Sequence, residues 1–268
     1  MTAVDVDRAR DAIARVAASD RLLVALDFDG TLSPLEDEPM DARMLPAARD
    51  AVAALVAAPD TVVAFVSGRS LVDLRVIAEH DDASHVLLAG SHGAEYWVPG
   101  EGLARHADDP ASAQLRDALR ARAEQSTAHL EGVWIEPKTF GFGVHTRRAQ
   151  QAAADEANRL VDEIVQAEAP HWRRRTGHNI VEFAFRHEGK DSAIAELRER
   201  VGATAVLFAG DDVTDEDAMR SLGPEDLGVR VGDGETAARI RVADIAALAG
   251  LLQQLATERT RALSREVS

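Results

Sequence analysis

Two pairs of aspartates each follow a short apolar run of the sequence. Asp27 and Asp29 come after LLVAL, and Asp211 and Asp212 come after AVLFAG. Such continuous apolar runs are typical of buried parallel strands, and open parallel sheets bind ligands beyond the carboxyl ends of their strands. We therefore expect the four carboxylates to converge at one edge of a sheet. An all-oxygen set of this kind suits Mg²⁺ and does not suit zinc.

The chemistry that this set favours is attack on a phosphate ester. A carboxylate can act as a nucleophile toward phosphorus when a metal cancels the charge repulsion, and a second carboxylate can exchange a proton with the leaving oxygen. Asp27 fits the first role and Asp29 the second. Lys190 begins the helix-like segment KDSAIAELRERV and can place an ammonium against the transferring phosphoryl group.

A second strand end carries the group expected to bind the phosphate oxygens. Ser67, Gly68 and Arg69 end the run TVVAFVSGR, and the Ser67 hydroxyl with the following backbone amide can hold these oxygens. His92, after a third run, is left outside the catalytic set, because a structural histidine in a loop explains it equally well.

The two ends of the chain predict an α/β unit that positions these residues. Four apolar runs predict strands at 22–30, 61–69, 85–93 and 205–212, with a helix at 46–58 between the first two. Further elements are expected at 215–222 (a helix capped by Thr214), 227–231 (a strand) and 235–261 (a helix). Glu216 and Asp217 are interpreted as the solvated start of the first of these helices.

The middle of the chain has a different pattern. Helical spacing at 111–130 and 149–167 alternates with strand-like segments at 132–147, 171–175 and 180–185, which predicts an inserted α+β domain. We expect a discontinuous core, 1–104 and 187–268, and a cap, 105–186. Trp134, Phe140 and Phe142 are interpreted as packing residues.

Composition narrows the class of protein. The 268 residues carry a formal charge of −16, which disfavours nucleic acid and anionic membranes as partners, and they include no cysteine. The charged N-terminal segment is unlike a signal peptide, and no apolar run reaches the roughly 20 residues of a membrane helix. A cytoplasmic monomer acting on a small molecule is the expectation.

Several motifs together carry a resemblance. DFDGTLSPL (27–35), SGR (67–69), Lys190 and GDDVTDEDAM (210–219) match, in order and spacing, the haloacid dehalogenase-like (HAD) phosphatase superfamily. GSHGAE (90–95) and EPKTFGFGVHTR (136–147) resemble its trehalose-6-phosphate phosphatases. The resemblance implies a Rossmann-like core with a parallel sheet, a mobile cap of the C2 type, and bound Mg²⁺.

The resemblance also implies roles for individual residues. Asp27 would be nucleophile and metal ligand, and Asp29 would be the acid/base that also binds the metal through its carbonyl. Asp211 would be the third protein ligand, with Asp212 and Asp215 supporting it. Ser67 and Lys190 match phosphate-binding positions, and the positions that match sugar contacts in the cap are Glu136, Lys138, His145 and Glu182. The chain departs from the family pattern at Asp191, where the family has glycine.

The expected activity is hydrolysis of trehalose 6-phosphate to trehalose and inorganic phosphate through an aspartyl phosphate. Another sugar phosphate, such as sucrose phosphate or mannosylglycerate phosphate, stays open as the substrate, because the cap decides selectivity. A phosphotransferase between sugar positions and a catalytically silent sugar-phosphate-binding regulator also stay open.

Overall fold

The computed structural model of the chain describes residues 3–105, 110–177 and 179–266. It divides into two compact units, the first formed by Met1–Arg105 with Glu188–Ser268 and the second by His106–His187. The helices and strands of the first unit are α1 (Ala3–Ala17), β1 (Leu22–Leu26), α2 (Pro46–Val56), β2 (Thr61–Val66), α3 (Leu71–Ile77), β3 (Leu87–Gly90), β4 (Glu95–Val98), β5 (Gly102–Arg105), α6 (Lys190–Val201), β10 (Ala205–Gly210), α7 (Asp215–Ser221), β11 (Leu227–Val231), β12 (Ile240–Val242) and α8 (Ile245–Glu266).

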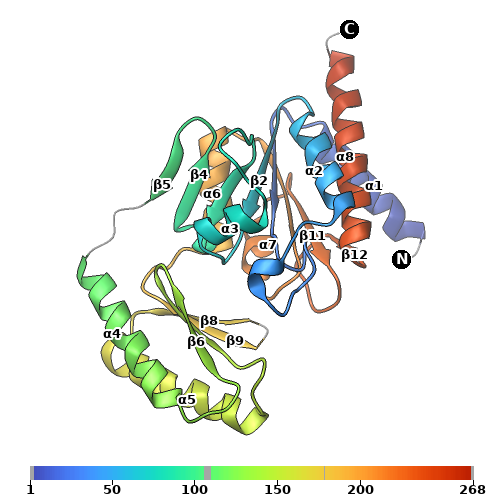
Figure 1. Cartoon of the computed structure of the whole chain (residues 1–268). Coiled ribbons are helices and arrows are strands. Elements are labelled where there is room, and N and C mark those ends of the chain that lie inside the picture. The colour runs from blue at the N-terminus through green and yellow to red at the C-terminus, as the bar shows by residue number, and fades with distance from the viewer. Residues whose placement is uncertain (1–2, 106–109, 178, 267–268) are drawn as a thin grey trace. The chain divides into compact units, whose positions relative to one another are not determined.

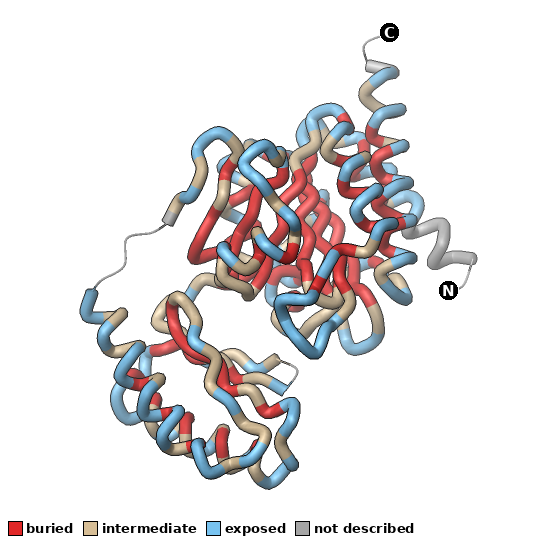
Figure 2. Tube along the Cα trace, viewed as in Figure 1, coloured by how far each residue is buried: buried red, intermediate tan, exposed pale blue. Residues whose placement is uncertain are grey.

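The first unit is built on an eight-stranded sheet in the order β12-β11-β10-β1-β2-β3-β4-β5 (Figure 1). Strands β12 to β3 in this order pair in parallel, and β4 and β5 extend the edge antiparallel. Apolar side chains of β1 point alternately to the two faces. Leu22, Val24 and Leu26 pack with α1, α2, α3 and α8, whereas Leu23 and Ala25 pack with α6 and α7. Both faces are therefore covered, as Figure 2 shows for the buried strands.

This architecture confirms the predicted α/β fold with a parallel sheet. The four predicted strands form β1, β2, β3 and β10, each shorter at its carboxyl end than its apolar run. The residues that follow these strands lie in loops at the carboxyl edge of the sheet, where the chemistry was expected.

The prediction of one helix over 235–261 is wrong in its first ten residues. Residues Ile240 to Val242 form β12, which pairs in parallel with β11. The helix α8 begins only after Asp244, whose carboxylate accepts the Ala247 N–H at 2.8 Å. An N-terminal aspartate cap of this kind was the available signal.

Besides β12, the helices α1 and α3 and the β4–β5 hairpin of the first unit were not predicted. Helix α3 has a side-chain cap, because the Ser70 hydroxyl accepts the Asp73 N–H at 3.2 Å. The hairpin turns at Pro99 and Gly100, a dipeptide typical of turns.

The second unit is an α+β layer. Its elements are α4 (Pro110–Thr127), β6 (Trp134–Lys138), β7 (Gly141–His145), α5 (Gln151–Glu168), β8 (Arg173–Gly177) and β9 (Ile180–Ala184). The strands form an antiparallel sheet in the order β6-β7-β9-β8. Helices α4 and α5 pack against one face of this sheet, around Phe142, Val144 and Phe183. The alternate positions of β6, β7 and β9 therefore point away from the helices.

Two of the three aromatic residues interpreted as packing residues are confirmed. Phe140 and Phe142 are buried, whereas Trp134 is 37% exposed and stacks on His145 with ring centroids 4.4 Å apart. The interpretation of Trp134 as a packing residue was wrong, because position 134 lies on the face of the sheet that the helices leave uncovered. Among the described helices of both units, none has the length and apolar character needed to span a membrane.

Candidate active site

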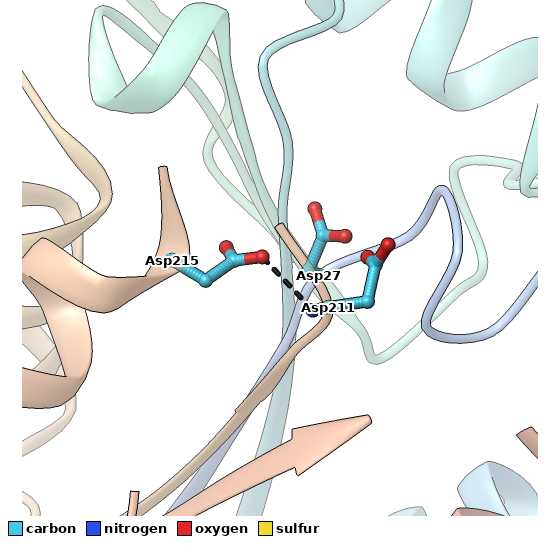
Figure 3. A group of neighbouring side chains, drawn as sticks. All are labelled: Asp27, Asp211 and Asp215. Atoms are coloured by element: carbon cyan, nitrogen blue, oxygen red, sulfur yellow. Dashed lines mark hydrogen bonds between the residues drawn. The ribbon is translucent and has the colours of Figure 1, made fainter. Parts of the chain in front are cut away.

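Three carboxylates from two strand ends and a helix start lie together in the first unit (Figure 3). Asp27 follows β1, Asp211 follows β10, and Asp215 is the first residue of α7. Each offers an oxygen, and these oxygens lie within 4.8 Å of one another. Asp27 and Asp215 are buried. We call these three residues the acidic cluster.

A buried ammonium partly neutralises the acidic cluster. Lys190 begins α6, and its Nζ donates to Asp27 Oδ1 at 2.6 Å and to Asp215 Oδ1 at 2.5 Å. Its side chain is only 4% exposed. Two of the three carboxyl groups thus share one lysine, and negative charge is in excess when all three are ionised.

Burial and crowding change the proton affinities in the acidic cluster. Burial raises the pKa of Asp27 well above its ordinary value, even though the Lys190 charge opposes it. Burial, reinforced by the charge of Asp215, raises the pKa of Asp211 to about 6. For Lys190, burial alone would lower the pKa, but the Asp215 and Asp27 carboxylates outweigh burial and raise it. The lysine therefore stays charged at neutral pH, while Asp27 and Asp211 hold their protons more tightly than ordinary aspartates.

Thr31 joins the two carboxyl groups with raised pKa. Its hydroxyl lies 3.2 Å from Asp27 Oδ2 and 3.0 Å from Asp211 Oδ1. A hydroxyl has only one proton to donate, so both contacts are hydrogen bonds only when one of the two carboxyl groups is protonated. This geometry agrees with the raised pKa values. The sequence reasoning missed this role of Thr31, although DFDGT places it four residues after Asp27.

Two glycines make the close approach of these carboxyl groups possible. A Cβ on Gly30 would lie 2.1 Å from Asp211 Oδ2, and the positive φ of 80° also favours glycine there. A Cβ on Gly210 would lie 2.3 Å from the Asp215 carboxyl carbon. The acidic cluster therefore depends on the absence of side chains at both positions.

Asp29 lies outside the acidic cluster, although the sequence reasoning placed it among the metal ligands. Its two oxygens accept hydrogen bonds from Arg69, at 2.7 Å from Nε and 2.6 Å from Nη2. Ser67 is buried beside this pair, and its hydroxyl accepts the Arg69 N–H at 3.1 Å. Arg69 thus lies close to the two functional groups that sequence reasoning assigned to proton transfer and phosphate binding.

The third member of the SGR segment is held by close packing. A Cβ on Gly68 would lie 2.7 Å from the imidazole of His92, so only glycine fits under this ring. His92 is buried, and its N–H donates to the Ser67 carbonyl at 2.9 Å. His92 therefore supports the SGR segment structurally.

Asp212 contacts the acidic cluster through its main-chain N–H group. The N–H groups of Asp211 and Asp212 both donate to Asp215 Oδ2, at 3.0 and 2.9 Å. Asp215 therefore orders this loop, and the prediction that the Thr214 side chain caps the helix is wrong, because Thr214 makes no side-chain capping bond. The carboxylate of Asp212 is not among the three in the cluster.

The four predicted sugar-binding residues lie together in the second unit, on the sheet face that the helices leave uncovered. Lys138 Nζ lies 2.9 Å from Glu182 Oε1 and 3.1 Å from Glu136 Oε2, and His145 Nε2 lies 2.7 Å from Glu136 Oε2. Glu136 and Glu182 face each other across Gly143 in the strand register. We call these four residues the cap cluster.

The charges of the cap cluster are balanced in a different way. Burial alone would raise the pKa of Glu136, but the hydrogen bond from His145 and the Lys138 charge lower it to about 2. Burial would lower the pKa of Lys138, and the Glu182 and Glu136 carboxylates raise it instead. The polar groups of the cap cluster therefore satisfy one another.

The donor set of the acidic cluster fits a hard divalent cation. It offers carboxylate oxygens and no sulfur, the pKa values of Asp27 and Asp211 are raised, and one lysine does not balance the charge of the three carboxyl groups. A cation of this kind would remove the repulsion that raises these pKa values.

Comparison with known proteins decides the family. The family model described as trehalose-phosphatase matches residues 25–244 of the chain. The chain belongs to this family. A trehalose-phosphate phosphatase of Mycobacterium tuberculosis is 32% identical over 267 residues, which cover 92% of this chain and 66% of that protein. An uncharacterized glycosyl hydrolase of the same species is 31% identical over 281 residues, covering 94% of this chain and 19% of that protein. The chain thus spans less than two thirds of each of these relatives.

Solved structures share the fold of this trehalose-phosphatase family member. The C-terminal domain of trehalose-6-phosphate phosphatase from Candida albicans superposes with a TM-score of 0.78 at 19% identity, covering 93% of this chain and 96% of that chain. A HAD subclass IIB sugar phosphatase gives a TM-score of 0.58 at 16% identity, covering 87% of this chain and 98% of that chain. The C-terminal domain of a Candida albicans trehalose synthase regulatory protein gives 0.73 at 14% identity, covering 91% and 97%. At these identities the likeness shows the HAD fold, and the site residues must carry the argument about activity.

Proposed function

We propose that the protein is a phosphatase that hydrolyses trehalose 6-phosphate to trehalose and inorganic phosphate. The observation that carries this proposal is the buried contact of Lys190 with Asp27 at the carboxyl edge of the sheet, in a chain of the trehalose-phosphatase family. It places a carboxylate nucleophile beside a fixed ammonium.

In the first step, Asp27 attacks the phosphorus atom, and the bond from phosphorus to the sugar oxygen breaks. Asp29 gives a proton to the leaving oxygen, so that trehalose departs as a neutral alcohol and Asp27 carries an aspartyl phosphate. Lys190 and Ser67 bind the equatorial oxygens and stabilise their charge in the transition state. Because Arg69 holds both oxygens of Asp29, one of these hydrogen bonds must be exchanged for the proton transfer.

In the second step, water attacks the aspartyl phosphate. Asp29, now ionised, takes a proton from this water, and the phosphorus bond to Asp27 breaks to release inorganic phosphate. Asp27 returns to its carboxylate form, and the buried Lys190 ammonium again becomes its partner.

We assign a divalent cation, Mg²⁺ by ligand hardness, to the carboxylates of Asp27 and Asp211 and the carbonyl of Asp29. When bound, it supplies charge neutralisation between the nucleophile and the phosphate. Asp212 and Asp215 then act as supports. Asp215 is assigned to support because one of its oxygens accepts the main-chain N–H groups of Asp211 and Asp212 and so orders the loop that carries Asp211.

We further propose that the core, 1–104 with 187–268, performs catalysis, and that the cap, 105–186, selects the sugar. The cap cluster of Glu136, Lys138, His145 and Glu182 offers donors and acceptors in matched positions, which is the chemistry that recognises several hydroxyl groups. We also propose that the enzyme is monomeric and cytoplasmic.

The experiment is phosphate release from trehalose 6-phosphate, glucose 6-phosphate and sucrose 6-phosphate, each with Mg²⁺ or with a chelator. Release from the trehalose ester that is lost with the chelator and lost in Asp27→Asn is the expected result. Release from a different ester would retain the mechanism and change the substrate. Absence of release from every ester would refute the proposal and favour a silent regulator.

The comparisons do not favour the alternative substrates or the regulator. The shared fold of a regulatory protein shows that fold alone does not decide between an enzyme and a regulator. Here Asp27, Asp29, Lys190 and Asp211 are all present. Lys190 donates a hydrogen bond to Asp27, and Asp27 and Asp211 both belong to the acidic cluster.

A further inference from the structure

A buried arginine from β11 contacts the loop that carries Asp211. Arg230 is 8% exposed, and its Nη1 donates to the Asp212 carbonyl at 2.8 Å. In the strand register Arg230 lies opposite Gly210, the residue that precedes Asp211. Sequence reasoning assigned no role to this arginine.

The acidic loop, residues 211–214, is thus fixed from two sides. Asp215 accepts the N–H of Asp212 at 2.9 Å, and Arg230 donates to the carbonyl of the same residue. Both main-chain polar groups of Asp212 are therefore bound by charged side chains that are themselves buried. The N–H belongs to the peptide that joins Asp211 to Asp212, and the carbonyl belongs to the next peptide, so two consecutive peptide planes beside Asp211 are each held by a buried charged side chain.

Glu216 is a further partner of Arg230. It is 4% exposed, its Oε1 lies 3.4 Å from Arg230 Nη1, and its Oε2 accepts the Ala237 N–H at 2.8 Å. The interpretation of Glu216 as a solvated helix start is therefore wrong. The neighbouring Asp217 is exposed and pairs with Arg220, as expected of a solvated helix start.

The remaining donors of Arg230 bind the next loop. Nε and Nη2 donate to the Asp233 carbonyl at 3.3 and 3.0 Å. Only the planar fork of arginine reaches two carbonyls and a carboxylate at once, and a lysine at this position would satisfy fewer of them.

We propose that Arg230, braced by Glu216, is a positioning residue that sets the divalent-cation affinity of the site by fixing the loop that carries Asp211. This inference rests on the metal site in the proposed function. Supports behind metal ligands typically change affinity 10- to 100-fold when they are removed.

The test is Mn²⁺ binding to the full chain without substrate, followed by electron paramagnetic resonance. In Arg230→Met, which keeps the stem and removes the donors, we expect the Mn²⁺ dissociation constant to rise about 10-fold or more. Arg230→Lys should lie between this variant and the wild type. The matched control is Arg241→Met, because Arg241 donates to the carbonyls of Gly232 and Gly234 but makes no contact with Asp212. Its dissociation constant should stay within about twofold of wild type.

A kinetic measurement separates positioning from general damage. At saturating Mg²⁺, Arg230→Met should recover most of the wild-type kcat, because the ligands are present and only their preorganisation is weakened. Near-ultraviolet circular dichroism establishes that each variant is folded. Should Arg230→Met fail to fold, Arg230→Lys and Glu216→Gln carry the test, and wild-type Mn²⁺ affinity in both would overturn the inference.

The outcomes distinguish this inference from the proposed function. Wild-type protein that binds Mn²⁺, together with folded Arg230→Met that binds it equally well, would overturn the inference and leave the metal site intact. Wild-type protein that binds neither Mn²⁺ nor Mg²⁺ would overturn both.

Discussion

The two polar clusters of the molecule handle buried charge in opposite ways. In the acidic cluster the carboxyl groups of Asp27 and Asp211 have raised pKa values, because burial and neighbouring carboxylates outweigh a single lysine. In the cap cluster the pKa of Glu136 is lowered to about 2, because His145 and Lys138 compensate for burial. The first cluster has one lysine against three carboxyl groups, whereas the second is internally paired.

This difference indicates separate tasks. A site with uncompensated carboxylates gains free energy from a bound cation and is suited to chemistry on a phosphate. A site whose groups already pair with each other binds a ligand only if the ligand replaces those hydrogen bonds with equally good ones, which favours a specific pattern of hydroxyl groups. Substitutions in the two clusters should therefore have different consequences.

The largest effect is expected at Asp27, the proposed nucleophile. Asp27→Asn removes the carboxylate to which we assign the attack, so hydrolysis of trehalose 6-phosphate and of p-nitrophenyl phosphate should both fall by at least about 10³-fold. Steady-state phosphate release measures this loss. Retained activity on either ester would mean that a different residue attacks phosphorus.

The next largest loss of activity is expected at Gly30, and Gly143 in the second unit provides the comparison. Gly30→Ala forces a Cβ to within 2.1 Å of the Asp211 carboxylate, so kcat/KM should fall about 100-fold for every ester. In Gly143→Ala, beside the cap cluster, the atom nearest to the new Cβ is Ile180 Cδ1 at 3.1 Å, so the loss should stay below about threefold on p-nitrophenyl phosphate. Equal losses on that ester would remove the contrast between the clusters.

The cap cluster should affect selectivity alone. Lys138→Met leaves the carboxylates of Glu136 and Glu182 without their shared ammonium, so the KM for trehalose 6-phosphate should rise about 10-fold or more. The kcat/KM for p-nitrophenyl phosphate should stay within about twofold. Arg159→Met, which removes an exposed ion pair on α5, is the matched control and should change neither value.

Metal-free protein should lose stability as the pH rises. The folded-state pKa of Asp211, about 6, lies above the ordinary value of 3.8, so the folded state binds the proton more tightly than the unfolded state. This contribution is fully present below pH 4 and is lost as the pH rises through 6. We expect a fall in Tm on the order of 5 °C between pH 4.5 and 7.5, measured by calorimetry with a chelator. Mg²⁺ should abolish the fall, and a pH-independent Tm would contradict it.

The smallest expected effect is at Glu136, where stability should fall as the pH is lowered and not as it is raised. The pKa of Glu136 is lowered from 4.5 to about 2, so its contribution to stability is present above pH 4.5 and is lost as the pH falls toward 2. Because Glu136 is about one third exposed, solvent screens this effect, and a shift of a degree or two is expected. Unfolding followed by tryptophan fluorescence, in wild type and Glu136→Gln, measures it. An identical acid response in the two proteins would refute this assignment.

Local apolar runs explain why the strands that carry the site were predictable. Leu22 to Leu26 are buried on both sides of the sheet, and such a run is visible without knowledge of any partner strand. The residues at its end, Asp27 and Asp29, were consequently placed at the correct edge. The three-residue strand β12 has no such run, and its pairing with β11 defines it.

Long-range pairing decided how each acidic residue is used. Glu216 and Asp217 are adjacent and chemically similar, yet one is buried against Arg230 and the other is solvated. Asp29 and Asp215 likewise have different partners, because Arg69 binds the first and Lys190 the second. Arg230, Arg69 and Lys190 each lie 14 or more residues from the carboxylate that they bind, so spacing alone carried no signal.

Arg259 of α8, far from the candidate site, is a further residue whose partners could not be predicted from the sequence. Its side chain is fully buried, and it donates to the carbonyls of Ala17, Asp20 and Asp60, among others. The sequence alone indicates only a charged residue in a C-terminal helix. Only folding brings these carbonyls around it.

The sequence by itself determined the α/β class, the family and the edge of the sheet at which the candidate site lies, because each depends on local periodicity and on residue types at fixed spacing. The tertiary structure alone decided which carboxylates share Lys190, which one Arg69 holds, and which glutamate contacts Arg230. Those outcomes depend on burial and on charge partners supplied by distant strands and helices, and these quantities exist only once the chain is folded.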